Sequence, residues 1–124
     1  MNEIMSTNGL RIYSVSEAIV DRYAPKEDGI VLRLEDVQIT IPRSLYTRFT
    51  ECLRDGTKMT VGRKNQRYME NFTISFIKSE ISGLVRLNLL QRTSGSRLPR
   101  AASVELTPIQ VRTIIAKVRN QNSE

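Results

Sequence analysis

The last third of the chain, from Gly83 to Arg119, constrains the fold most, because it places a strand, a basic loop, a short apolar run and a helix in succession. In its first segment, apolar residues alternate with polar ones, so that Val85, Leu87 and Leu89 share one face. Alternation with a period of two is typical of a strand that buries one side. The stretch therefore predicts a strand–loop–strand–helix unit.

The helix of this unit is well marked at its start. Thr107 can accept a hydrogen bond from a free amide of the first turn, and Pro108 suits the first helical position, where no partner for an N–H is needed. Apolar residues then recur at i, i+3, i+4 and i+7, namely Val111, Ile114, Ile115 and Val118. A helix with one apolar face must pack on something, and the preceding sheet is the nearest candidate.

The first part of the chain alternates between strand and turn patterns. Ile19–Tyr23 is either a strand or a helical turn, and Ala24–Gly29 is a turn. Strands are predicted at Leu10–Val15, Ile30–Leu34 and Val37–Ile41, with a tight connection at Glu35-Asp36. Residues 1–9 are polar and are expected to fray.

From Pro42 the hydrophobic period changes to that of a helix, which Gly56 is expected to end. Its apolar positions are Leu45, Phe49, Cys52 and Leu53. Beyond it the pattern predicts a strand at Lys58–Val61, a cationic turn at Gly62–Arg67, a strand at Phe72–Lys78 and a turn at Ser82-Gly83.

The two halves repeat one plan, because each passes through about four strands and ends in an amphipathic helix. Leu45, Phe49 and Cys52 match Val111, Ile115 and Val118 at a spacing of 66, whereas the preceding strands fit 65, which predicts one inserted residue at the second helix. A repeat of this length indicates a duplicated subdomain with an internal pseudo-twofold axis. Coincidence is the alternative, since strand–strand–helix patterns are common.

The expected fold class is α+β, with antiparallel sheets each followed by an amphipathic helix, in two ββββα-like halves that form an internal pseudodimer. The expected divisions are a flexible N-terminus at 1–9, a first half at 10–56, a second and basic half at 57–120, and a flexible tail at 121–124.

The composition excludes several kinds of chemistry. The 124 residues include no histidine and one cysteine, which removes Ser-His and Cys-His pairs, histidine-bound metals and an internal disulfide. Cys52 falls on the apolar helix face and is expected in the core. We therefore expect a binding protein without a cofactor or metal, not an enzyme. No apolar run is long enough to cross a bilayer and no secretory signal is visible, so the expected location is cytoplasmic.

The positive charge is concentrated in the second half. Residues 1–56 hold seven Lys plus Arg against nine Asp plus Glu, whereas residues 57–124 hold twelve against four, and the whole chain has a formal net charge of +6. Fourteen of the nineteen cations are arginine, whose planar guanidinium suits phosphate oxygens and base stacking. A merely solvated charged face is the alternative.

The C-terminal half resembles a known family. The residues that carry the resemblance are Gly83–Leu87, the loop Ser94–Arg100, and Ser103–Pro108 leading to Val111. They are similar to the positive cofactor four family of transcriptional coactivators and, more distantly, to the plant Whirly proteins, over about half the chain. The resemblance implies four antiparallel strands and a helix per unit, pairing of two units through their helices, and binding of single-stranded DNA on the sheets. Val111 stands where that family usually has an aromatic residue.

The candidate binding residues follow from what single strands need, a basic track for the backbone and aromatic platforms for the bases. Tyr68 is the preferred stacking candidate, whereas Phe72 and Phe76 alternate like core residues, with stacking as the alternative. Arg86 marks a sheet face that is either functional or merely solvated, and Arg112 and Arg119 are expected on a solvated helix side. The predicted nucleic-acid-binding residues are Arg63, Lys64, Arg67, Tyr68, Lys78, Arg86, Arg92, Arg97 and Arg100.

Two functions remain open. The first is a protein that binds single-stranded DNA, or less favourably RNA, with little sequence selectivity, as an accessory factor in transcription or replication. The alternative is a small protein-interaction or inhibitor domain that binds an acidic partner. The acidic N-terminal half is a possible contact for a protein partner. The chain is expected to be a monomeric pseudodimer, or a homodimer through Ile114 and Val118.

Overall fold

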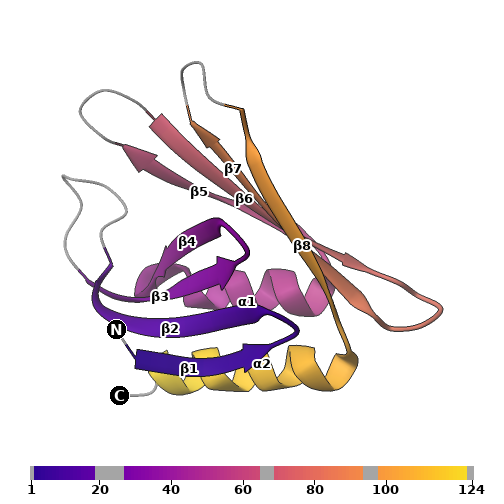
Figure 1. The fold of residues 1–124 in the computed structure, drawn as a ribbon. Helices are drawn as coiled ribbons and strands as arrows, with labels where there is room; N and C mark the ends of the chain where they lie inside the picture. The colour runs from indigo at the N-terminus through magenta and orange to yellow at the C-terminus, as the bar shows by residue number, and fades with distance from the viewer. Residues whose placement is uncertain (1, 19–26, 65–68, 94–97, 123–124) are drawn as a thin grey trace.

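The computed structural model describes residues 2–18, 27–64, 69–93 and 98–122, and these form two four-stranded antiparallel sheets, each followed by a helix (Figure 1). The first half contains β1 Asn2–Thr7, β2 Leu10–Ala18, β3 Glu27–Leu34, β4 Val37–Pro42, a 3₁₀ turn at Arg43–Leu45 and helix α1 Tyr46–Asp55. The second half contains β5 Lys58–Lys64, β6 Met69–Lys78, β7 Val85–Thr93, β8 Arg100–Leu106 and helix α2 Pro108–Asn122. Strand order follows the chain in both sheets. The expected α+β fold with two similar ββββα halves is confirmed.

The two ends of the chain are more ordered than the sequence pattern predicts. Residues 2–7, expected to be flexible, form β1 and pair antiparallel with β2. The signal for this hairpin is the dipeptide Asn8-Gly9, whose φ angles of 51° and 86° are those of the two-residue turns that match strand twist. At the other end α2 continues through Asn122, so two residues of the predicted tail are helical. The prediction for Ile19–Tyr23 lies outside the described residues, and β3 begins at Glu27, within the predicted turn.

The end of α1 and the start of α2 are as the sequence predicts, but α1 begins at Tyr46, after the 3₁₀ turn Arg43–Leu45, and not at Pro42. Gly56 closes α1 in the left-handed region, at φ 69°, and its amide donates to the Cys52 carbonyl. At the start of α2, the Gln110 amide donates to Thr107 Oγ1 at 3.2 Å, and the Thr107 amide donates to Gln110 Oε1 at 2.8 Å. This reciprocal pair is a capping box.

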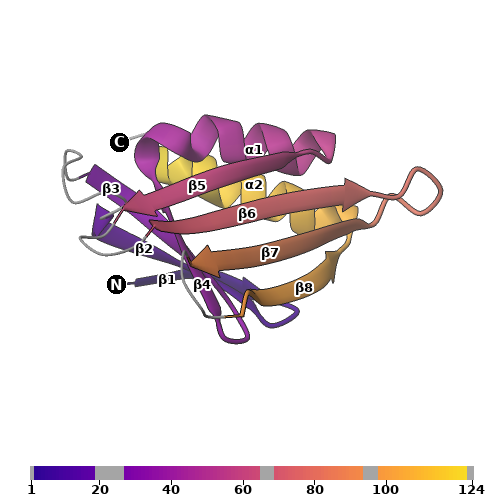
Figure 2. The ribbon, with the colours of Figure 1, turned by 90° about the horizontal axis from the view of Figure 1, so that it is seen from above.

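The halves share one hydrophobic core. Buried side chains of both sheets and both helices belong to a single cluster. The helices lie side by side (Figures 1 and 2), and each contacts the sheet of the other half: α1 touches β5 and β6, and α2 touches β1. Since β1 and β5 are equivalent first strands, these exchanged contacts are what a pseudo-twofold arrangement requires. Ile114 and Val118 are buried in this core, at 1% and 0% exposure, and so are not available for pairing with a second chain.

The repeat has one spacing from strand to helix. Val37, Ile39 and Ile41 of β4 occupy the same positions in the first sheet as Ala102, Val104 and Leu106 of β8 occupy in the second. Each pair of equivalent residues is 65 positions apart. On the helices, the buried residues Tyr46, Phe49 and Leu53 match Val111, Ile114 and Val118 at the same spacing, whereas Leu45 and Ile115 are only partly buried. The helices therefore keep the spacing of the strands, and the prediction of an inserted residue at the second helix is wrong. Burial, and not the apolar pattern alone, decides which residues of the two helices are equivalent.

The second half differs from the first in the length of two hairpins. Two residues separate the buried pair Leu34 and Val37, whereas residues 90–101 separate their counterparts Leu89 and Ala102. Likewise two residues separate Thr7 and Leu10, whereas residues 60–73 separate the corresponding Met59 and Ile74. We call residues 60–73 and 90–101 the extended hairpins. Because the sheet is antiparallel, the strands lead into both extended hairpins at the same end, opposite the β6–β7 turn (Figure 1).

Within the described part of the chain, neither helix has the length and hydropathy that a membrane span requires.

Candidate nucleic-acid interface

The outer face of the second sheet is uncovered, because both helices lie behind the opposite face, and it is mostly polar apart from Ile77 and Leu90 (Figure 2). Strand register sets its side chains in rows across the sheet. One row contains Lys58, Ser75, Asn88 and Ser103. The inner face of the same strands carries the buried Phe72, Ile74 and Phe76 of β6, with their neighbours Leu87 and Leu89 on β7. The sheet thus offers a surface of short hydrogen-bonding side chains backed by the core.

The extended hairpins carry most of the predicted cations. Segment 60–73 contains Arg63, Lys64 and Arg67 with one acid, Glu70, and segment 90–101 contains Arg92, Arg97 and Arg100 with no acid. The backbones of Arg63 and Lys64 lie in β5, in register with Glu70 and Met69. The predicted site residues Arg67, Tyr68 and Arg97 lie outside the described residues.

Arg92 and Arg100 are the best-placed cations of this end. Both are exposed, and Arg92 lies opposite Asn71 while Arg100 lies opposite Gln91. Because side chains alternate along a strand, Arg92 belongs to the outer face and Arg100 to the other face of the ribbon. Neither guanidinium group makes a hydrogen bond or ion pair to a side chain that the structure describes, and both side chains are exposed.

Two predicted residues, Lys78 and Arg86, lie away from this cluster. Lys78 pairs with Val85 and Arg86 with Ile77, next to the β6–β7 turn at the opposite end of the sheet. Lys78 lies seven positions after Asn71, which faces Arg92, and at about 3.3 Å per position this is about 23 Å. Arg86 is on the outer face but donates to Glu105 Oε1 at 3.1 Å, which partly neutralises it. The predicted set is therefore not one site, because strand alternation and length divide it.

The aromatic residues of the second half that the structure describes are in the core. Phe72 and Phe76 are 5% and 2% exposed, and Phe76 packs edge-on against Phe49 at 5.7 Å between ring centroids. Burial excludes both rings as platforms for bases. Cys52 is buried as predicted, with its Sγ 3.6 Å from the Lys58 carbonyl.

Sequence reasoning missed a polar cluster on the outer face of the first sheet. Arg33 lies over the ring of Tyr13, 5.3 Å from its centroid, and donates to Gln38 Oε1 at 2.8 Å. The hydrogen bond that Arg11 donates to Tyr13, with a smaller contribution from Glu3, raises the pKa of Arg11. The signal was present in the alternation of Arg11 and Tyr13 with the buried Leu10 and Ile12. The acidic half therefore also presents arginine and an aromatic ring.

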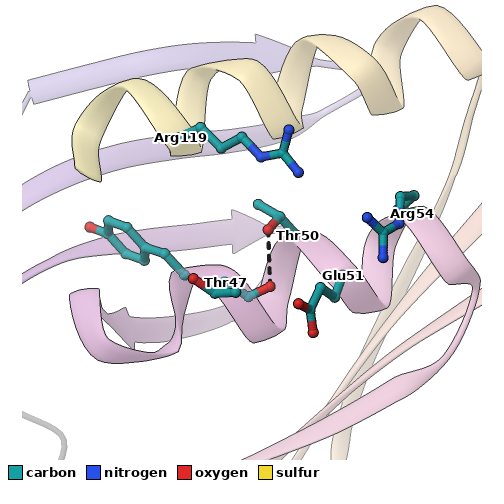
Figure 3. Close-up of a pocket in the computed structure, with 6 residues that line it drawn as sticks. Thr47, Thr50, Glu51, Arg54 and Arg119 are labelled. Carbon is teal, nitrogen blue, oxygen red and sulfur yellow. Dashed lines mark hydrogen bonds between the residues drawn. The ribbon is translucent and has the colours of Figure 1, made fainter. Parts of the chain in front are cut away.

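A hollow of about 220 Å³ lies between the two helices (Figure 3). Arg119 reaches over it from α2, and Thr50 and Arg54 face it from α1. The buried Thr50 hydroxyl donates to the Thr47 carbonyl at 3.0 Å within its own helix, and the pKa of Asp55, beside Arg54, is lowered by the hydrogen bond from that guanidinium. Thr50 and Arg54 thus have partners within α1, and the hollow is the space between two packed helices. Arg119 is exposed, as expected of a solvated helix side.

Comparison with known proteins gives little beyond these observations. No protein-family model matches the chain, and no curated protein matches it. A solved structure, that of a protein of unknown function from the DUF155 family of Prochlorococcus sp. NATL2A, is similar at 12% identity, with a TM-score of 0.38 and 94% of each chain covered.

Proposed function

We propose that the protein binds single-stranded nucleic acid, DNA in preference to RNA and with little base selectivity, at the extended hairpins of its second sheet. The adjoining outer face of that sheet is the continuing track for the strand. The sequence resemblance to single-strand-binding coactivators supports this proposal, and so does the distribution of charge.

The observation that carries the proposal is the position of the cations. Six of the nineteen arginine and lysine residues lie in the extended hairpins, the two segments that are longer in the second half than in the first. Only one acidic residue lies in these segments. β5, β6, β7 and β8 lead into the two segments at the same end of the sheet, so one flexible ligand bound at this end can contact both strand pairs. Clustered arginine and lysine side chains bind a polyanion by displacing its condensed counterions.

The outer sheet face favours a single strand over a duplex. Both helices pack behind this sheet, so the surface beside the hairpin cations is made of strands and offers no helix to a major groove (Figure 2). The short side chains of Thr60, Thr73 and Ser103 leave the outer face open to bases, which can also hydrogen-bond to Asn88. Contacts to phosphates with few contacts to base edges give affinity without sequence readout.

The test is binding of fluorescein-labelled single strands, dT20 and U20, and of a 20-bp duplex, followed by fluorescence anisotropy. We compare the wild type with Arg92→Glu/Arg100→Glu and with the control Arg48→Glu/Lys117→Glu. All four arginine and lysine residues are exposed, and each double variant lowers the net charge by the same four units. We expect dT20 to bind most tightly, and the hairpin variant to lose about tenfold or more in affinity while the helix control loses about twofold or less.

Equal losses in both variants would mean that bulk charge and not the hairpins attracts the oligonucleotide. Tighter binding of the duplex than of dT20 would contradict the preference for single strands. Circular dichroism of each variant checks that the fold is retained.

A further inference from the structure

A second pocket lies at the end of the second sheet opposite the extended hairpins. It has a volume of about 280 Å³ and lies between the end of α1, the β6–β7 turn and the start of α2. Its apolar lining comes from Leu53, Val85, Pro108, Val111 and Ile115. This volume is slightly below the roughly 300 Å³ at which sites for drug-sized ligands begin, so it suits one or two side chains of a partner.

Three cations from three different elements rim this pocket. They are Arg54 on α1, Lys78 at the end of β6 and Arg112 on α2, and all are exposed. Arg54 forms an ion pair with Asp55 at 3.0 Å, and Lys78 is near enough to Asp55 to contribute to the lowered pKa of that carboxyl. Lys78 and Arg112 make no hydrogen bond or ion pair to any part of the chain that the structure describes. An apolar floor with a positive rim is complementary to an apolar group flanked by negative charges.

Exposed apolar side chains extend this surface. Ile81, two residues before the pocket residue Gly83, is 100% exposed, and Ile109, next to Pro108, is 67% exposed. Large apolar side chains beside an apolar pocket are typical of an interaction surface.

We propose that this pocket binds an acidic peptide segment of a partner protein, with one or two large apolar side chains in the pocket and carboxylates on Lys78 and Arg112. The cations come from three elements around an apolar floor, and a peptide with several carboxylates beside its apolar side chains matches this arrangement. A second copy of the chain is disfavoured because each molecule has a net charge of +6. The inference is independent of the proposed function, since the pocket is about 23 Å along β6 from the level of Arg92.

The test uses the fluorescein-labelled peptide DEELFEDL and two companions, DEEIYEDI and DEEVMEDV, in fluorescence anisotropy titrations. Two control peptides keep only one feature each: DEESSEDS retains the charge without the apolar side chains, and NQQLFQNL retains the apolar side chains without the charge. We compare the wild type with Lys78→Glu/Arg112→Glu, Arg92→Glu/Arg100→Glu and Arg48→Glu/Lys117→Glu, which carry equal changes of charge.

We expect at least one acidic–apolar peptide to bind, and both control peptides to bind about tenfold more weakly or not at all. The Lys78/Arg112 variant is expected to lose about tenfold, the other two variants about twofold or less, and dT20 affinity to remain unchanged in the Lys78/Arg112 variant. The proposed peptide site is overturned if none of the three acidic–apolar peptides binds or if DEESSEDS binds as tightly as they do. It is also overturned if the Arg92/Arg100 variant loses as much peptide affinity as the Lys78/Arg112 variant. A failure of dT20 binding alone overturns the proposed function and leaves the pocket unaffected.

Discussion

The side-chain amide of Gln110 donates a hydrogen bond of 2.7 Å to the hydroxyl of Thr7, across 103 residues of sequence. The Oε1 atom of Gln110 accepts hydrogen bonds from the backbone N–H of Thr107, at the start of α2, and from the side-chain amide of Asn8 at 3.3 Å. Asn8 also donates to the Glu105 carbonyl at 2.9 Å. One glutamine therefore caps the last helix and fixes it to the first hairpin of the chain.

We predict that Gln110→Ala lowers the free energy of unfolding by about 2 kcal/mol, because it removes a cap and two links between halves. Thr7→Val removes one of these links and is expected to cost about 1 kcal/mol. In urea denaturation the double variant should lose about 0.5–1 kcal/mol less than the sum of the two single losses. Strict additivity would show that the Thr7–Gln110 contact contributes nothing.

The exchange of helices between the halves predicts that neither half folds alone. α1 packs on β5 and β6, and α2 packs on β1, so a fragment of residues 1–56 or 57–124 leaves its helix without its main partner. We expect each purified fragment to lack a cooperative thermal transition in circular dichroism, and the equimolar mixture to regain one. A cooperative transition in an isolated fragment contradicts the shared core.

The sequence predicted local features well where a few residues determine the geometry. Thr107-Pro108 predicted the start of α2, and Gly56 predicted the end of α1. The alternation around Val85 predicted which residues of β7 lie on the inner face. It failed where distant contacts decide. The burial of Tyr46 and Ile114 depends on the packing of α1 against α2, and the apolar pattern alone gave the wrong helix phase.

The candidate site shows the same division. The cationic character of segments 60–73 and 90–101 is visible in the sequence, but their excess length over the first half emerges only from strand register. The separation of Lys78 from Arg92 and the pairing of Arg86 with Glu105 are likewise consequences of register. The pocket beside Lys78 was not predicted, because its lining comes from α1, the β6–β7 hairpin and α2, which are distant from one another in sequence.

A substitution at Gly56 tests the close contact between α1 and β6. A Cβ built on Gly56 lies 3.0 Å from the Lys78 Cβ and 3.3 Å from the Lys78 amide, and its φ of 69° adds backbone strain. The control is Gly9, which has a similar φ of 86° but no atom within 4 Å of such a Cβ. We expect Gly9→Ala to cost about 1–2 kcal/mol in urea denaturation and Gly56→Ala to cost clearly more. Equal costs would mean that Lys78 moves aside freely.

The pair Arg54–Asp55 predicts a dependence of stability on pH. The hydrogen bond from Arg54 holds the pKa of Asp55 below its ordinary value. The native state therefore binds this proton less readily than the unfolded chain, so the contribution is present at neutral pH and is lost as pH falls through the native pKa. We expect Arg54→Gln to raise the pKa of Asp55 toward its ordinary value in a carbon-detected NMR titration. The difference in stability between wild type and variant should shrink below about pH 4, and a constant difference would contradict the link.

The salt dependence of oligonucleotide binding tests whether the hairpin cations touch phosphates. For single strands the slope of log K against log salt is about −0.7 per phosphate contact, so six contacts give a slope of about −4. Arg92→Glu/Arg100→Glu removes two contacts and should make the slope less steep by about 1.4. Arg48→Glu/Lys117→Glu lowers the net charge equally but removes no contact, and its slope should match that of the wild type. Titrations of dT20 between 50 and 300 mM NaCl (roughly the range in which counterion release dominates) provide the measurement. If both variants shift the slope alike, the long-range field of the protein and not the hairpin arginines governs binding.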